Sequence, residues 1–262
     1  MVLPIFQVDA FTDHLFGGNP AAIIPLENWL PDQTMQSIAA ENNLAETAFF
    51  VKEPAGYHIR WFTPLAEVSL CGHATLASAH VLFDHMNYQE NQIEFQSKSG
   101  ILRVRREGEH LTLDFPAGTM VQIDIPEELT EAIGLKPVLA FKGKTDYMLV
   151  YSTRNEIEQM APDMYRLNQI EARGTIVTAP GEEVDFVSRF FAPRLGVPED
   201  PVTGSAHTSL TPYWAKRLDK KELRAMQLSK RKGHLILKLA GDRVEISGKA
   251  VTYLEGRIFL DV

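Results

Sequence analysis

The segment of the sequence that decides the fold reads EVSLCGHATLASAHVLF, residues 67–83. It begins like the end of a strand, turns at Gly72 and continues as a run of small and apolar residues. A helix that is apolar on all sides is a buried helix. Its first turn leaves backbone N–H groups without partners beside His73, which suits a carboxylate. The sequence therefore predicts a buried helix from Gly72 with an anion site at its start.

The same pattern returns about half a chain later. EDPVTGSAHTS, residues 199–209, repeats the order acid, three residues, Cys or Thr, Gly, polar residue and Ala. Glu67 matches Glu199, and Gly72 matches Gly204, in both cases 132 residues apart. A second buried helix is therefore expected from Gly204.

A further match lies just upstream of each glycine. RWFTP at 60–64 matches RFFAP at 189–193, which lies 129 residues later in the chain. Two linked matches in similar register favour duplication over chance similarity of short motifs. We therefore expect an N-terminal domain over 1–117 and a C-terminal domain over 118–262, with the option that the last strand crosses back to the first domain.

Short strands dominate both halves. In the first half they are expected near 3–11, 21–25, 44–51, 57–63, 92–96, 100–107 and 110–115. In the second half they are expected near 138–142, 147–151, 174–179, 185–191, 226–230, 234–240, 243–249 and 251–260. Pro212 predicts a kink or an early end of the second helix. Without strict βαβ alternation or a nucleotide-binding glycine fingerprint, the fold class is α+β.

Composition excludes several classes of partner. A net charge of −8 argues against nucleic acid and anionic membranes, which require clustered Lys and Arg. The single cysteine excludes an internal disulfide, and the start of the chain lacks the basic and apolar regions of a signal peptide. No stretch approaches the length of a membrane-spanning helix. These features predict a cytoplasmic protein.

The starts of the two predicted helices are the candidate binding site. If the halves are related by approximate two-fold symmetry, Gly72 and Gly204 face each other across the domain interface, where ligand sites commonly form. Two sets of N–H donors would then hold a small acid by its carboxylate. The alternative is that both glycines are only strand-to-helix turns.

Other polar residues near the motifs have both functional and structural interpretations. Glu46 begins a strand and shares a face with Ala48 and Phe50. It is either a catalytic carboxylate or a solvent-facing residue at a strand edge. Asp200 before Pro201 is alternatively a turn former. A metal site would have to use His73, His80 and His207, but no His-x-x-x-His or Cys-x-x-Cys pair occurs, so no metal is expected.

Five ordered motifs together resemble one family. They are GNPAA at 18–22, NLAETAF at 43–49, RWFTP at 60–64, LCGHAT at 70–75 and DPVTGSAH at 200–207. This set resembles the PhzF family of phenazine-biosynthesis-like isomerases. The resemblance implies a diaminopimelate-epimerase-like fold: two similar domains, each a β-barrel-like sheet wrapped around a central helix, with the active site between them. It also implies cofactor-free proton transfer at carbon, commonly in a homodimer.

Position by position, the resemblance assigns roles to individual residues. Glu46 matches the general acid/base, and His73 and Asp200 match residues that orient or polarise the substrate. The surroundings of the substrate carboxylate correspond to Gly72, Gly204 and Ser205. The expected function is an isomerase that moves a proton within a small anionic carboxylic acid.

At two positions the sequence departs from the family pattern, and this leaves alternatives to the isomerase function open. Ala45 stands where the family often has Ser, so a hydroxyl contact there does not carry over. Related epimerases and racemases use facing cysteines, whereas this chain has Cys71 and Thr203. An amino- or hydroxy-acid racemase or epimerase, and a catalytically silent small-acid binding protein, remain the alternatives.

Overall fold

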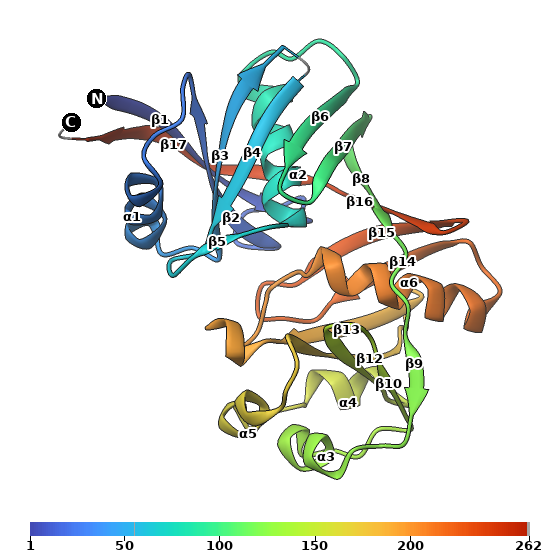
Figure 1. Cartoon of the computed structure of the whole chain (residues 1–262). Helices are drawn as coiled ribbons and strands as arrows, with labels where there is room; N and C mark the ends of the chain where they lie inside the picture. The colour runs from blue at the N-terminus through green and yellow to red at the C-terminus, as the bar shows by residue number, and fades with distance from the viewer. Residues whose placement is uncertain (55, 261–262) are drawn as a thin grey trace. The chain divides into compact units, whose positions relative to one another are not determined.

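The computed structural model describes residues 1–54 and 56–260 (Figure 1). It divides into two compact units, one made of Met1–Phe115 with Glu245–Val262 and the other of Pro116–Val244. The boundary thus falls two residues before the predicted one. Within the described residues, no helix is both long and apolar enough to cross a membrane.

The last strand of the chain belongs to the first unit. Strand β17 (Ala250–Phe259) pairs antiparallel with β1 (Val2–Ala10), from Val2 opposite Phe259 to Ala10 opposite Ala250. This long ladder of backbone hydrogen bonds places the last strand in the first unit.

The first unit is built mostly from strands. Between β1 and β17 it contains β2 (Asn19–Leu26), α1 (Asp32–Asn42), β3 (Glu46–Glu53), β4 (Gly56–Phe62), β5 (Glu67–Val68), α2 (Gly72–His80), the π-helix η1 (Val81–His85), β6 (Gln92–Ser97), β7 (Gly100–Glu107) and β8 (His110–Pro116). Strand β16 (Arg243–Gly248) spans the second junction of the two units in the sequence.

The second unit has more helices than expected. It contains β9 (Val121–Ile123), α3 (Glu127–Ile133), β10 (Leu139–Lys142), β11 (Asp146–Val150), α4 (Arg154–Glu158), α5 (Met164–Gln169), β12 (Gly174–Pro180), β13 (Phe186–Phe191), the 3₁₀ helix η2 (Pro193–Leu195), α6 (Gly204–Leu218), β14 (Glu222–Gln227) and β15 (Gly233–Ala240). The sequence analysis did not predict α3, α4 and α5. Each has seven residues or fewer, which is too short for a clear helical period.

Strand pairing repeats in the two units. In the first, β2–β3 is parallel, β3–β4 antiparallel, β4–β6 parallel and β6–β7 antiparallel. In the second, β11–β12 is parallel, β12–β13 antiparallel, β13–β14 parallel and β14–β15 antiparallel. Helix α2 lies between β4 and β6 in the sequence, as α6 lies between β13 and β14. The common order is what duplication of one unit produces.

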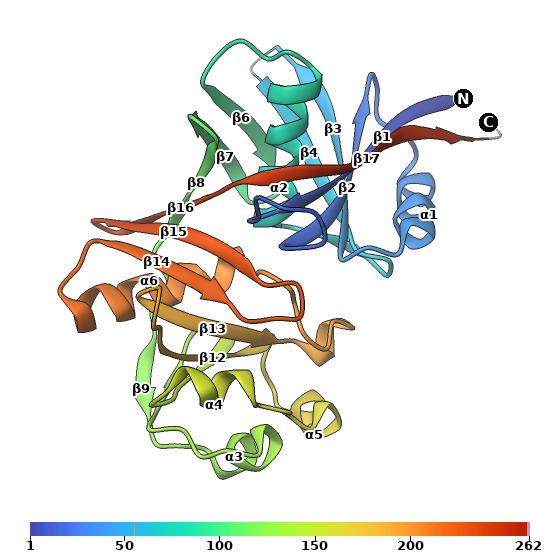
Figure 2. The same cartoon turned by 180° about the vertical axis from the view of Figure 1, so that it is seen from behind.

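A central helix is packed against sheet strands in each unit. Every residue of α2 from His73 to Ala79 is buried, and the helix contacts β1, β2, β3, β7 and β17 (Figures 1 and 2). Helix α6 contacts β14 and β15. Its Trp214 donates Nε1–H to Thr178 Oγ1 of β12 at 3.0 Å and stacks on Phe186 of β13. Both glycine-turn helices are therefore the buried helices that the sequence predicts.

The helix α1 covers one face of β3, and this contact shows in which direction the side chains of β3 point. Phe49 and Val51 belong to the hydrophobic cluster under α1. Because neighbouring residues of a strand point to opposite faces, Glu46, Ala48 and Phe50 point away from α1. In the second unit the corresponding outer layer is formed by α3, α4 and α5.

Helix α6 does not end at Pro212, so of the predicted kink or early end, the early end is wrong. It continues to Leu218. Pro212 has no N–H for the carbonyl of Thr208, and this carbonyl instead accepts a hydrogen bond from Gly118 N at 3.0 Å. A Cβ on Gly118 would lie 2.3 Å from Ser209 Oγ and 3.2 Å from Ser209 Cα, so a larger residue would have to displace the Ser209 side chain.

Each unit carries the same ion pair, between residues that the sequence comparison matched. Arg60 Nε and Nη2 donate to the two carboxylate oxygens of Glu67 at 2.8 and 2.9 Å. Arg189 binds Glu199 in the same bidentate way, at 2.7 and 3.0 Å. The hydrogen bond from Arg60 is the main reason that the pKa of Glu67 is lowered to about 2. In both units the pair links a sheet strand to the segment that precedes the central helix.

Arg189→Met is expected to destabilise the second unit by about 1–3 kcal/mol, because it leaves the largely buried Glu199 carboxylate without its partner. The control is Arg103→Met, whose pair with Glu94 is exposed and should contribute less than about 1 kcal/mol. Urea unfolding at neutral pH measures both. Equal effects of the two substitutions would contradict a structural role for the repeated pair.

Candidate active site

The structure brings Glu46 and His73 together. Glu46 is the first residue of β3 and points away from α1, while His73 lies in the first turn of α2. Glu46 Oε2 lies 3.1 Å from His73 Nε2. The two groups are not oriented as a hydrogen bond, so the contact is electrostatic. The Glu46 side chain is 19% exposed against 6% for His73, so a small molecule can reach the carboxylate more easily than the ring.

Two further side chains contact the other nitrogen of this histidine. Asn19 Nδ2 lies 3.2 Å and Cys71 Sγ 3.6 Å from His73 Nδ1. The sequence analysis quoted Asn19 in a motif but gave it no role. Gly18 precedes it at φ 60°, where a Cβ would lie 2.1 Å from the Ala10 carbonyl oxygen. A glycine is therefore required at this turn, and it sets the buried Asn19 against the imidazole.

Electrostatics give the two ionisable neighbours of Glu46 different roles. Burial, together with the charge of Glu46, raises the pKa of the Cys71 thiol to about 11, so the thiol stays protonated near neutral pH. Burial alone would lower the pKa of His73, but the facing Cys71 and Glu46 side chains outweigh it and raise that pKa well above its usual range. The cluster therefore combines the Glu46 carboxyl group, an imidazole whose protonated form is favoured and a neutral thiol.

These three side chains are also potential metal ligands. Glu46, Cys71 and His73 each offer one ligand atom, and the three atoms lie within 4.8 Å of one another. The sequence analysis weighed only histidines for such a site. Of these, His80 Nε2 contacts Thr252 Oγ1 and His207 Nδ1 donates to the Thr203 carbonyl.

The remaining predicted site residues belong to the second unit. Thr203 Oγ1 donates to Asp200 Oδ2 at 2.5 Å, just before α6 begins at Gly204. Ser205 Oγ accepts a hydrogen bond from Arg173 Nη1 at 3.0 Å. The structure thus groups the predicted residues within each unit. That the two groups converge on one substrate stays a prediction.

Arg173 was not anticipated from the sequence. It binds the buried Asp146 in a bidentate pair, with Nε 2.8 Å from Oδ1, and its guanidinium lies over the Phe190 ring. A fixed guanidinium beside Ser205 favours a negatively charged ligand. No motif marks this residue, because its partners come from separate elements, β11, β13 and α6.

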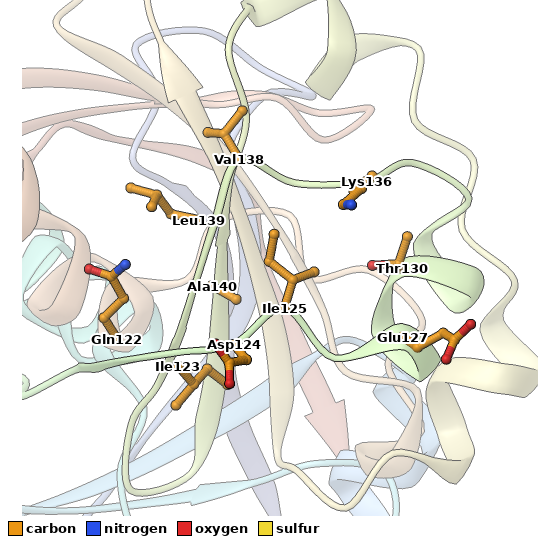
Figure 3. Close-up of a pocket in the computed structure, with 10 residues that line it drawn as sticks. All are labelled: Gln122, Ile123, Asp124, Ile125, Glu127, Thr130, Lys136, Val138, Leu139 and Ala140. Carbon is orange, nitrogen blue, oxygen red and sulfur yellow. The ribbon is translucent and has the colours of Figure 1, made fainter.

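A cavity of about 550 Å³ lies elsewhere in the second unit (Figure 3). It is lined by residues of β9, α3, β10 and their connections: Gln122, Ile123, Asp124, Ile125, Glu127, Thr130, Lys136, Val138, Leu139 and Ala140. None of the predicted site residues lines it. It therefore contributes no support to the site predicted from the motifs.

Comparison with known proteins identifies the family. The family described as "Phenazine biosynthesis-like protein" matches residues 8–256. The chain belongs to this family. It is 53% identical to "Uncharacterized isomerase PA3578" of Pseudomonas aeruginosa, over 99% of the chain and 100% of the relative. It is 43% identical to "Phenazine biosynthesis-like domain-containing protein 1" of Mus musculus, over 98% and 99%.

Comparison with solved structures leads to the same family. A PhzF family protein of Enterococcus faecalis superposes with a TM-score of 0.97 at 46% identity, covering 99% of the chain and 100% of that protein. A hydroxyproline epimerase of Agrobacterium vitis, at 11% identity and a TM-score of 0.63, shares the fold alone. The PhzF-family chain therefore has the predicted α+β, diaminopimelate-epimerase-like fold, and it is an enzyme of the isomerase type.

Proposed function

We propose that this PhzF-family isomerase moves a proton between two carbons of a small carboxylic acid, without a cofactor, and that Glu46 acts first as base and then as acid. The observation that carries the proposal is the 3.1 Å contact between a partly exposed carboxyl group and a buried imidazole whose pKa that carboxyl group helps to raise. The carboxylate can accept a proton, and the cation beside it can stabilise negative charge.

The proposed reaction conserves all atoms. The Glu46 carboxylate takes a proton from a carbon whose resulting negative charge is delocalised over a conjugated system or a carboxyl group. The positive charge of His73, held in place by burial, stabilises this intermediate. The Glu46 carboxylic acid then returns the proton to the second carbon, which regenerates the carboxylate.

The remaining predicted residues enter the proposal as substrate contacts. Asp200 orients the substrate, and the N–H groups of Gly72 and Gly204, with the Ser205 hydroxyl, bind its carboxylate. These roles rest on the resemblance and on the position of both glycines as first residues of buried helices. The homodimer also stays a prediction, which light scattering of the purified chain tests.

Incubation in D₂O with a panel of unsaturated, amino and hydroxy acids tests the proposal. NMR is expected to show deuterium at a carbon of at least one acid, together with a positional isomer of that acid. If calorimetry shows that acids of the panel bind and none of them exchanges, the chain is a silent binding protein and the proposal fails.

The racemase alternative predicts a different role for Cys71. Inversion by two bases needs a proton acceptor on each side of the carbon, but the Cys71 thiol is protonated near neutral pH and the Thr203 hydroxyl donates to Asp200. We therefore expect Cys71→Ser to lower exchange by less than about tenfold, since general acid/base groups contribute more than this. Loss of all turnover in this variant would favour the racemase.

A further inference from the structure

We propose that Glu46, Cys71 and His73 also form a binding site for a thiophilic divalent metal ion of the zinc type, and that the bound ion blocks proton transfer by Glu46. The binding site is independent of the proposed function. The inhibition rests on it, because it requires Glu46 to be the acid/base.

The geometry of the cluster carries the binding step. Three donor atoms lie within 4.8 Å of one another. Cys71 Sγ lies nearer to His73 Nδ1 and Glu46 Oε2 nearer to Nε2, so zinc bonds of about 2.0–2.3 Å require the thiol to turn toward the ion as the set contracts. Cys71 and His73 come from one helix start, so their spacing is fixed by the backbone. Glu46 comes from β3, and its partly exposed side chain can adjust toward an ion.

The cluster also contains two polar atoms that lack hydrogen bonds. His73 Nε2 and Glu46 Oε2 are buried and face each other without forming one. Buried polar atoms without hydrogen bonds are unfavourable. A metal ion between the side chains would replace this contact with two bonds to the same atoms.

The donor types select the class of ion. Sulfur, nitrogen and carboxylate oxygen are the donors of zinc sites, whereas Mg²⁺ and Ca²⁺ prefer oxygen alone. On binding, the Cys71 thiol and the His73 ring each release a proton to solvent, and the thiolate and the neutral imidazole coordinate the ion. The thiolate and the Glu46 carboxylate then balance the two positive charges within a largely buried cluster. Three protein ligands leave one coordination position for water.

Titration of the full chain with Co²⁺, as a spectroscopic substitute for zinc, tests the site. Cys71 is the only cysteine, so a thiolate-to-cobalt charge-transfer band reports this residue alone. We expect the band to appear, to be displaced by Zn²⁺ and to be lost in Cys71→Ser. Glu46→Gln and His73→Gln should each weaken Co²⁺ binding by about tenfold or more.

The matched control is His58→Asn, which removes a half-exposed histidine of the same unit and should leave the Co²⁺ affinity unchanged. Circular dichroism confirms that each variant is folded. Absence of the band at excess Co²⁺ would overturn the inference. So would a band whose affinity is the same in wild type, Glu46→Gln and His73→Gln, because a lone thiol would then be the ligand.

The Co²⁺ titration and the D₂O exchange experiment can be interpreted separately, because the Co²⁺ spectra are recorded without substrate. A chain that exchanges C–H protons but does not bind Co²⁺ overturns only the metal site. A chain that binds Co²⁺ but exchanges no acid overturns the proposed function, and the inhibition with it, but leaves the metal site.

Discussion

Glu46→Gln is expected to lower the rate of C–H exchange by a factor of about 10²–10⁴ while the acid still binds. The amide has nearly the size of the carboxylate and keeps a carbonyl oxygen near His73 Nε2. It cannot accept and return a proton at carbon. The comparison is made by NMR in D₂O, with binding measured by calorimetry.

The chain offers a matched control on the same strand. Glu53 lies at the other end of β3, with its carboxylate 3.3 Å from the His58 ring. It is therefore a second carboxylate–imidazole pair, outside the proposed site. Glu53→Gln should leave exchange unchanged. Equal exchange in wild type and Glu46→Gln would remove Glu46 from the mechanism.

Between pH 6.5 and 4, the second unit is expected to lose about 3 kcal/mol of stability through His207 alone. The ring is fully buried in α6, and this burial lowers its pKa to about 4. Nδ1 donates to the Thr203 carbonyl at 2.8 Å, and the ring stacks on Phe186. The neutral form is therefore the one that fits the fold.

The sign follows from the direction of the shift. A histidine whose pKa is lowered by folding contributes its full stability above the unfolded pKa, and this contribution is lost as the pH falls toward the folded pKa. His73 is present in both proteins, so its contribution cancels in the comparison of wild type with His207→Gln. Carboxylates titrate equally in wild type and variant.

The measurement is urea unfolding of wild type and His207→Gln at several pH values. Glutamine can donate a hydrogen bond but does not titrate, so the variant should lose about 3 kcal/mol less than wild type over this range. Parallel pH profiles for the two proteins would show that His207 is not held neutral by its surroundings.

The sequence predicted the features that depend on local pattern. Gly72 and Gly204 begin buried helices as expected, and the α+β, diaminopimelate-epimerase-like fold is confirmed. The course of α6 through Pro212 could not be predicted, because Gly118, far away in the sequence, supplies the hydrogen bond that satisfies the helix. For the same reason the pairing of β17 with β1 was left as an option, since the two strands are at opposite ends of the chain.

The candidate site also has residues that the sequence predicted and residues that it could not predict. Glu46 and His73 were found through motifs, and the two-residue period of β3 already predicted the face on which Glu46 lies. The contacts of Asn19 and Arg173 were missed because each joins segments that are distant in sequence. The cluster of Glu46 with Cys71 was also unpredicted, since only the packing of β3 beside α2 brings a carboxylate to the thiol.

The most direct test of proton transfer by Glu46 is the identity of the product formed in D₂O from the acid that exchanges. NMR and chiral chromatography are applied to the products of wild type and Glu46→Gln. The account predicts that wild type yields a positional isomer with deuterium at the new C–H position, and that Glu46→Gln yields almost none. A product that is the mirror image of the starting acid, with no change in the position of any bond, would contradict it.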